Sequence, residues 1–333
     1  MTEPILRLAV REDIPKIKSF INTNWKRYNL INNEALFQFY FVSGDQVNFV
    51  LAEDEAGTLY GTLAFIYCGY AKHPDIGATL FKTIRSPYTL LGIRMYDALK
   101  ALTGYRTCFS QNMVPNTATL HRMMGHTVCE FEHWYRLSDR SEYHIARVKD
   151  KRILPACEGC MELILFPEAS SLFLKFTPPC DLIPYKDAAY IRRRYYEYPA
   201  YRYNVYGVRD RKSGHIGSIL VCREVEAAGE RMLKIVDFIG DAYAFSQLSN
   251  ELQRLMDQNG YEYIEMYQYG LAAQTMKSAG FVRRTTDDPN VIPTWLEPLA
   301  QVNTEYMLYY TDHMDRIRLF RADCDMDRPN LEE

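Results

Sequence analysis

LLGIRMYDALKALTGYRTCFSQNMVPNTATLHRMMGHTV (90–128) and LSNELQRLMDQNGYEYIEMYQYGLAAQTMKSAGFVRR (248–284) are two stretches of this chain that share one pattern. Each begins with an amphipathic helix that stops at Gly-Tyr, followed by a short strand, a second short helix, a glycine and a further strand. The glycines that frame the unit lie 21 positions apart in the first copy and 20 in the second. A repeat with a period of about 155 residues is too long for a solenoid and predicts two similar domains.

The composition is that of a soluble globular protein. The 333 residues suffice for two domains, and 47% are hydrophobic and 24% charged. A net charge of -3 gives no general electrostatic reason to bind nucleic acid or a membrane. No stretch approaches 18 uninterrupted apolar residues, and the charged N-terminus does not resemble a signal peptide. With eight scattered cysteines interpreted as reduced thiols, we expect a cytoplasmic protein.

The elements around each copy follow from hydrophobic periodicity and from turn residues. In the first half we expect a strand and helix, a hairpin, a third strand, and then the repeated unit with its helix over 92–102. The second half predicts strands over 161–168 and 171–176, a helix over 187–198, a hairpin, a long strand and the unit again. This order predicts an α/β (α+β) class in which each domain is a mixed, mainly antiparallel sheet flanked by helices. The predicted division is a domain over 1–140, a polar linker over 141–160, and a domain with an extra tail over 161–333.

The order strand, helix, hairpin, long strand, helix, strand, helix, strand resembles the GNAT acyltransferase superfamily. The resemblance implies that acetyl-CoA or another acyl-CoA is the co-substrate. Its pyrophosphate would contact free amides at the start of the helix that follows the fourth strand. The family pattern there is Arg or Gln, two residues, Gly, one residue, then Gly or Ala. With Gly92 as the second glycine, Pro87 takes the basic position, so the pattern is incomplete. The residues implied for this role are Lys82, Arg85, Leu91, Gly92 and Ile93.

The second copy departs further from the family pattern. Gly240 precedes its helix, but no basic residue does, and Asp241 would repel a pyrophosphate. Many GNAT enzymes also carry a tyrosine four residues before the last glycine of the unit, where its hydroxyl can protonate the leaving thiolate. His121 takes that position in the first copy and Met276 in the second, and only histidine can transfer a proton near neutral pH. His121 is therefore the candidate acid, although a single histidine on a short helix is often structural.

The candidates for the general base are the two acidic residues on the last strand of the first domain, Glu130 and Glu132. The sequence assigns these two residues to that strand and does not give their distance from the acceptor.

The chain as a whole resembles a narrower group of tandem GNAT-like proteins that are associated with bacterial surface-glycan and sugar-nucleotide gene clusters. The resemblance rests on HWYRL, RYYEYPAYRY, W-L-E-P and the terminal D-x-D-x-D-R-P-N. It implies a context in surface-glycan synthesis more than a reaction, and in that context we expect the amine of a sugar or sugar nucleotide as acceptor. In the tail, three alternating aspartates could form internal ion pairs, bind a polar substrate or bind a divalent cation, and we predict no metal site. The residues expected to bind substrate are Tyr195, Arg202, Asp323, Asp325, Asp327 and Arg328.

Three functions remain open from the sequence. The first is an acyl-CoA-dependent N-acyltransferase that acts on an amino sugar or sugar nucleotide in surface-glycan synthesis. The second is a non-catalytic module that binds a glycan, a nucleotide sugar or a protein and has degenerate CoA sites. The third is an aminoacyl-tRNA-dependent transferase, but the acidic net charge and the lack of a basic stripe count against tRNA. We expect no nucleic-acid partner and no membrane span, and a homodimer is left open.

Overall fold

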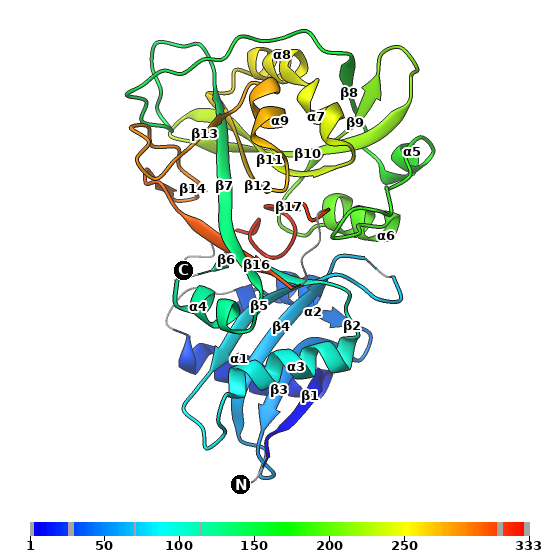
Figure 1. The fold of residues 1–333 in the computed structure, drawn as a ribbon, viewed down its shortest axis with the longest axis vertical. Coiled ribbons are helices and arrows are strands. Elements are labelled where there is room, and N and C mark those ends of the chain that lie inside the picture. The colour runs from blue at the N-terminus through cyan, green and yellow to red at the C-terminus, as the bar shows by residue number, and fades with distance from the viewer. Residues whose placement is uncertain (1–2, 26–29, 70, 114, 312–315, 330–333) are drawn as a thin grey trace.

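The computed structural model describes residues 3–25, 30–69, 71–113, 115–311 and 316–329. The described residues form two lobes, and one long strand, β7 (Thr127–Leu137), runs through both (Figure 1). Within the described residues, no helix has the length and apolar character needed to cross a bilayer.

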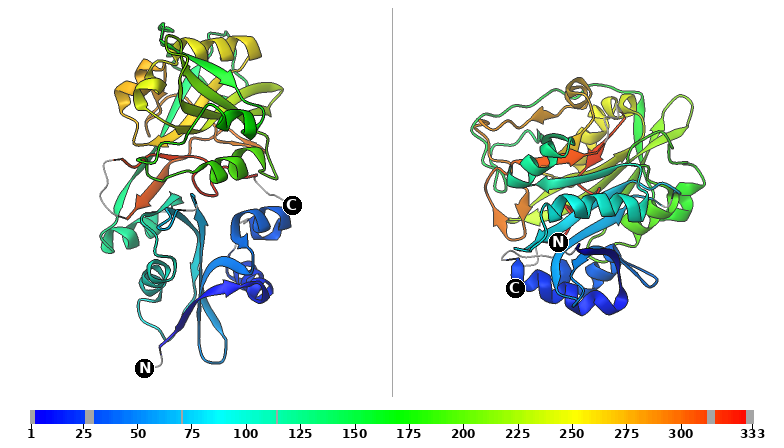
Figure 2. Two further views of the ribbon diagram at one scale, coloured as in Figure 1. Left: turned by 90° about the vertical axis from the view of Figure 1, so that its right-hand side faces the viewer. Right: turned by 60° about the horizontal axis from the view of Figure 1, so that its bottom comes forward.

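The first lobe is a sheet with helices on both faces. Alternation along its strands explains the two faces, because Phe49 and Leu51 join one apolar cluster while Val50 and Ala52 join another. The helices α1 and α2 cover one face, and α3 and α4 cover the other (Figure 2). The elements are β1 (Ile5–Val10), α1 (Ile14–Asn24), α2 (Glu34–Phe41), β2 (Val42–Ser43), β3 (Gln46–Glu53), β4 (Leu59–Tyr67), β5 (Ile76–Thr83), α3 (Leu91–Thr103), β6 (Cys108–Met113) and α4 (Pro115–Met123).

The second lobe repeats this plan, with a hairpin, a long strand and a parallel neighbour. Its sheet order is β8, β9, β10, β11 and β12, and β12 is parallel to β11. The elements are β8 (Met161–Leu165), α5 (Ala169–Phe173), α6 (Ala188–Ile191), β9 (Asn204–Asp210), β10 (Ile216–Ala227), β11 (Glu230–Ile239), α7 (Ala242–Ser246), α8 (Ser249–Asn259), β12 (Tyr263–Tyr269), α9 (Ala273–Ser278), β13 (Val282–Arg283), β14 (Trp295–Leu296), β15 (Leu299–Ala300), β16 (Tyr306–Tyr310) and β17 (Leu319–Phe320).

Two strands join the lobes into one sheet. The late strand β16 lies between β6 and β7 and is antiparallel to both. Further along, β7 pairs with β12 of the second lobe, from Glu132 opposite Gln268 to Leu137 opposite Tyr263. The predicted α+β class with mixed, mainly antiparallel sheets is confirmed. Where one domain ends and the next begins stays a prediction, because β7 and β16 serve both lobes.

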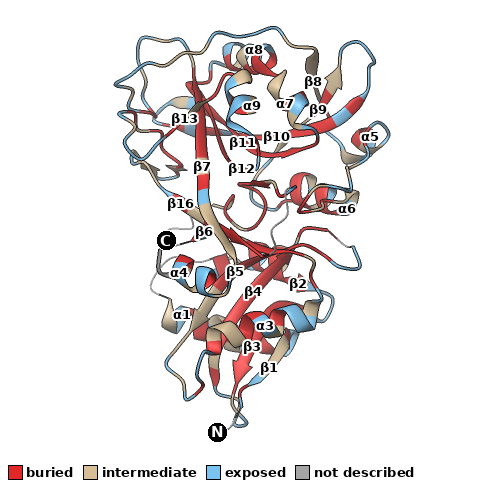
Figure 3. Cartoon of the chain, in the orientation of Figure 1, coloured by how far each residue is buried: buried red, intermediate tan, exposed pale blue. Residues whose placement is uncertain are grey.

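One predicted strand is wrong. Residues 169–173 form helix α5 where we expected a strand over 171–176. Leu172 and Phe176 are the buried residues of this stretch, and a spacing of four is the spacing of a helix face. Segment 141–160 contains no helix or strand, yet it packs on the second lobe, since the Ile145 amide donates to Glu262 Oε1 at 2.9 Å. Buried residues accordingly continue across both lobes and their junction (Figure 3).

Candidate functional site

The strands β5 and β6 separate after a short parallel contact. They pair only at Ile76 with Cys108 and at Gly77 with Phe109. Beyond this contact each strand has a residue with a left-handed backbone, Leu80 (φ 44°) on β5 and Asn112 (φ 62°) on β6. Such conformations interrupt regular strand geometry. The separation opens a cavity of about 180 Å³, which we call the first splay.

The first splay is lined from both faces of the sheet. One side comes from α3 and α4, the helices that follow the two separating strands. The other side comes from Trp25, which ends α1, and from the C-terminal tail. A cavity lined from both sides passes between the strands. Its lining comprises Trp25, Ala78, Thr79, Leu80, Phe81, Tyr96, Ser110, Gln111, Asn112, Met113, Thr117, His121, Tyr309, Asp325 and Arg328.

Helix α3 begins at one end of β5 with free amides. Leu90 precedes it in a left-handed conformation (φ 54°) and has no side-chain oxygen to cap the helix. The amides of residues 91–93 therefore have no partner within the helix. A Cβ on Gly92 would meet the Phe81 ring at 2.9 Å, so glycine lets the helix start pack against this ring. Lys82 is half-buried on β5, and Arg85 is exposed in the loop before α3.

The predicted acid His121 lies in the first splay, in a stack of rings. Its centroid is 3.5 Å from that of Tyr309, and its Nδ1 is 3.0 Å from Nδ1 of His126. The buried Nε2 has no hydrogen-bond partner among the described residues. Burial, followed by His126, lowers the pKa of His121 to about 3. The ring is therefore neutral at pH 7, and it can donate or accept a hydrogen bond there but does not carry an acidic imidazolium proton.

The structure does not bring the two predicted bases to this cavity. Glu130 and Glu132 lie on β7 beside Arg283, at 2.8 and 3.3 Å. Glu132 also accepts hydrogen bonds from the Trp134 indole at 2.9 Å and from the Gln268 amide at 2.8 Å. The insertion of β16 between β6 and β7 moves β7 away from the splay. Among the described lining residues the carboxylate is that of Asp325, which lies 193 positions after Glu132 in the sequence.

The corresponding splay in the second lobe is closed by the tail. The strands β11 and β12 are parallel over Leu233–Ile235, and β17 then pairs with β12 beyond that contact. On the other side, the Ala322 amide donates to the carbonyl of Val236 at 2.9 Å. The chain's own residues therefore fill the space between these two strands.

A cluster of buried charged residues holds the tail in place between β11 and β12. The Lys186 ammonium contacts Asp237 Oδ1 at 2.7 Å and forms an ion pair with Asp323. Tyr195 donates its hydroxyl to the same Asp237. Burial raises the pKa of Asp323 to about 7, although Lys186 opposes the shift. Two of the predicted substrate residues, Tyr195 and Asp323, are therefore held inside the protein.

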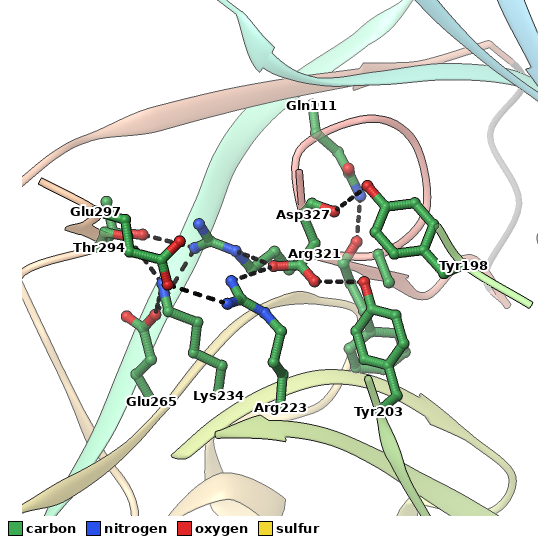
Figure 4. A network of polar contacts seen from close by, with 12 residues as sticks. Gln111, Tyr198, Tyr203, Arg223, Lys234, Glu265, Thr294, Glu297, Arg321 and Asp327 are labelled. Atoms are coloured by element: carbon green, nitrogen blue, oxygen red, sulfur yellow. Dashed lines mark hydrogen bonds and ion pairs between the residues drawn. The ribbon is translucent and has the colours of Figure 1, made fainter. Parts of the chain in front are cut away.

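The other tail residues have separate partners. Asp327 accepts hydrogen bonds from the Tyr203 hydroxyl at 2.7 Å and from Arg223 at 3.1 Å, so this part of the tail lies against the second lobe (Figure 4). Asp325 pairs with Arg328 at 3.4 Å beside the first splay. Arg202, the remaining predicted substrate residue of this segment, is exposed. Within the described chain, no group of three metal-ligating side chains is found.

Solved structures with the same fold are GNAT proteins. A GCN5-related N-acetyltransferase from Anabaena variabilis matches with a TM-score of 0.51 at 12% identity, over 92% of this chain and 72% of that chain. A conserved protein of unknown function from Enterococcus faecalis, described as a probable N-acyltransferase, matches with a TM-score of 0.51 at 11% identity over the same shares. No protein-family model and no curated protein matches the sequence. At such identities the likeness establishes the fold alone, and that fold is the α+β fold of the GNAT N-acyltransferases.

Proposed function

We propose that this protein is an acyl-CoA-dependent N-acyltransferase whose reaction takes place in the first splay. The observation that carries the proposal is the contrast between the two lobes. The separation of β5 and β6 holds a cavity of about 180 Å³ that is lined from both faces of the sheet, whereas residues 319–322 fill the equivalent separation of β11 and β12. One lobe is built to admit a ligand between its strands, and the other is closed by its own chain.

The residues around the first splay suit an amide-forming reaction. The free amides of residues 91–93 would bind the pyrophosphate, and backbone amides near Leu80, where β5 separates from β6, would polarise the thioester carbonyl. The acceptor amine attacks that carbon, so that the N–C bond forms and the C–S bond breaks. Asp325 accepts the proton that the amine loses. His121, in the tautomer that carries its proton on Nε2, donates a hydrogen bond to the departing sulfur.

The acceptor side of the cavity supports an amino sugar or sugar nucleotide as the acceptor class. Trp25 offers an aromatic face, Asp325 a carboxylate for the amine, and Arg328 a donor for a hydroxyl or an acidic group. All three reach the cavity from the face of the sheet opposite α3 and α4. The acyl donor and the acceptor would therefore enter from opposite faces and meet between the strands.

Calorimetric titration with acetyl-CoA tests the proposal. Gly92→Glu should abolish binding because its carboxylate repels the pyrophosphate at the helix start. Gly92→Ala is the matched control, since it adds the same Cβ against Phe81 but no charge, and it should retain most of the binding. Asp325→Asn should bind acetyl-CoA as the unmodified protein does.

No heat with acetyl-CoA, and none with longer acyl-CoA, on folded protein would reject the enzyme in favour of the non-catalytic binding module. Equal loss of binding in Gly92→Ala and Gly92→Glu would show that packing at Phe81, and not charge, is responsible.

A further inference from the structure

A second, smaller cavity lies in the second lobe beside the tail. We call it the basic cavity because four cationic side chains line it, from strands β10 and β11 and from the tail. Its lining also includes two aromatic rings and one half-exposed carboxylate, that of Glu297. The cations and rings are Arg223, Lys234, Arg321, Arg328, Tyr201 and Trp295.

Two buried carboxylates outside the lining of the basic cavity hold three of its four cations in place (Figure 4). Asp327 accepts from Arg223 at 3.1 Å and from Arg321 at 3.2 Å. Glu265 lies 2.9 Å from the Lys234 ammonium. Neither carboxylate lines the cavity, whereas the cations do. The carboxylates therefore hold the cations in position, and the cations present positive charge to the cavity. Fixed donors lose little entropy when an anion binds.

Arg223 has a donor without a partner. Its side chain is 8% exposed, its guanidinium carbon lies 3.7 Å from the centroid of the Tyr201 ring, and its Nε is buried without a hydrogen bond among the described residues. A buried donor of this kind costs free energy unless an acceptor arrives. The nearest acid at the rim, Glu297, is half exposed and 4.0 Å from Arg223, so this pair is weak.

We propose that the basic cavity binds a phosphate group. Several fixed guanidinium and ammonium donors around a small cavity match the oxygens of a phosphate better than the two oxygens of a carboxylate. Arg328 lines both this cavity and the first splay. We assign the acceptor to the class of phosphorylated amines, an assignment that rests on the proposed function. The phosphate of such an acceptor occupies the basic cavity, and its amine reaches Asp325.

The titration of Lys234 supports an anion at this place. Burial, followed by Arg321, lowers the pKa of Lys234 to about 8, and Glu265 opposes the shift. Arg223 also disfavours the charged form, while the carbonyl of Thr294 accepts a hydrogen bond from the ammonium at 2.8 Å. A bound phosphate would favour the charged ammonium, so binding near pH 8 should take up protons.

Calorimetric titration of the full chain with inorganic phosphate tests the site without acyl-CoA. Arg223→Gln should weaken binding about tenfold or more, because a charge-assisted donor is lost. Glu297→Gln should tighten binding about two- to fivefold, because it removes a competing rim carboxylate that is worth little to the fold. Glu158→Gln, an exposed change of the same charge far from the cavity lining, is the matched control and should leave the affinity unchanged.

The outcomes distinguish phosphate binding at the basic cavity from acyl transfer in the first splay. Phosphate binding that responds to Glu297→Gln but not to Glu158→Gln supports the site even if acetyl-CoA does not bind, and then only the link to acyl transfer fails. Acetate that binds as tightly as phosphate, or phosphate affinity that is the same in all variants, would overturn the proposal. Should Arg223→Gln fail to fold, the Glu297→Gln comparison decides alone.

Discussion

Asp323 shares the Lys186 ammonium with Asp237 in the closed splay of the second lobe, and this arrangement makes stability depend on pH. The folded pKa is about 7 against an ordinary value of 3.8, so the folded protein holds a proton that the unfolded chain releases. The stabilisation is complete below pH 4 and is lost as the pH rises to 7. Relative to Asp323→Asn, the free energy of unfolding should fall by at most about 4 kcal/mol over this range, at about 1.4 kcal/mol per pKa unit.

Urea denaturation at pH 4, 5.5 and 7 measures this difference. Asp139→Asn is the control, because Asp139 is exposed and pairs only with Lys151 at the surface. Its pH profile should run parallel to that of the unmodified protein. If the Asp323→Asn profile is parallel too, the carboxylate is ionised in the folded state and the assigned proton is wrong.

At the scale of elements, the C-terminal tail is part of the core of the second lobe. Phe320 is buried against β12 and beneath the Lys186 ammonium, which lies 5.4 Å from its ring. Phe320→Ala should lower the free energy of unfolding by about 3–5 kcal/mol, since the ring leaves a cavity inside the closed splay. Leu174→Ala is the control, because Leu174 is 86% exposed, and it should change stability little. Chemical denaturation measures both, and equal effects would show that the tail is not part of the core.

At the scale of the whole molecule, one sheet runs through both lobes, and the strands β7 and β16 join its two halves. A core cluster contains Phe37 of the first lobe, Ile219 of the second and Leu319 of the tail. Because β16 completes the first sheet and β7 continues into the second, we expect a single unfolding transition in calorimetry, with equal calorimetric and van't Hoff enthalpies. The fragment 1–140, which lacks β16, should aggregate. Two separate transitions, or a soluble folded fragment, would contradict this coupling.

The sequence by itself determined the local elements and their repetition. Helix periodicity and the glycine stops act over a few residues, so the repeated unit, the succession of most strands and helices along the chain and a helix start within one residue of Gly92 could be predicted. Leu172 and Phe176 were misassigned because a short apolar run suits a strand as well as a helix.

Only the tertiary structure decided which carboxylate lines the same cavity as His121. Glu130 is near in sequence but β16 separates its strand from the splay, whereas Asp325 arrives with a tail whose path depends on Lys186, Arg223 and other residues far away along the chain. The closure of one splay and the opening of the other have the same origin. Both depend on contacts between residues tens to hundreds of positions apart, and such contacts leave no periodic signal in the sequence.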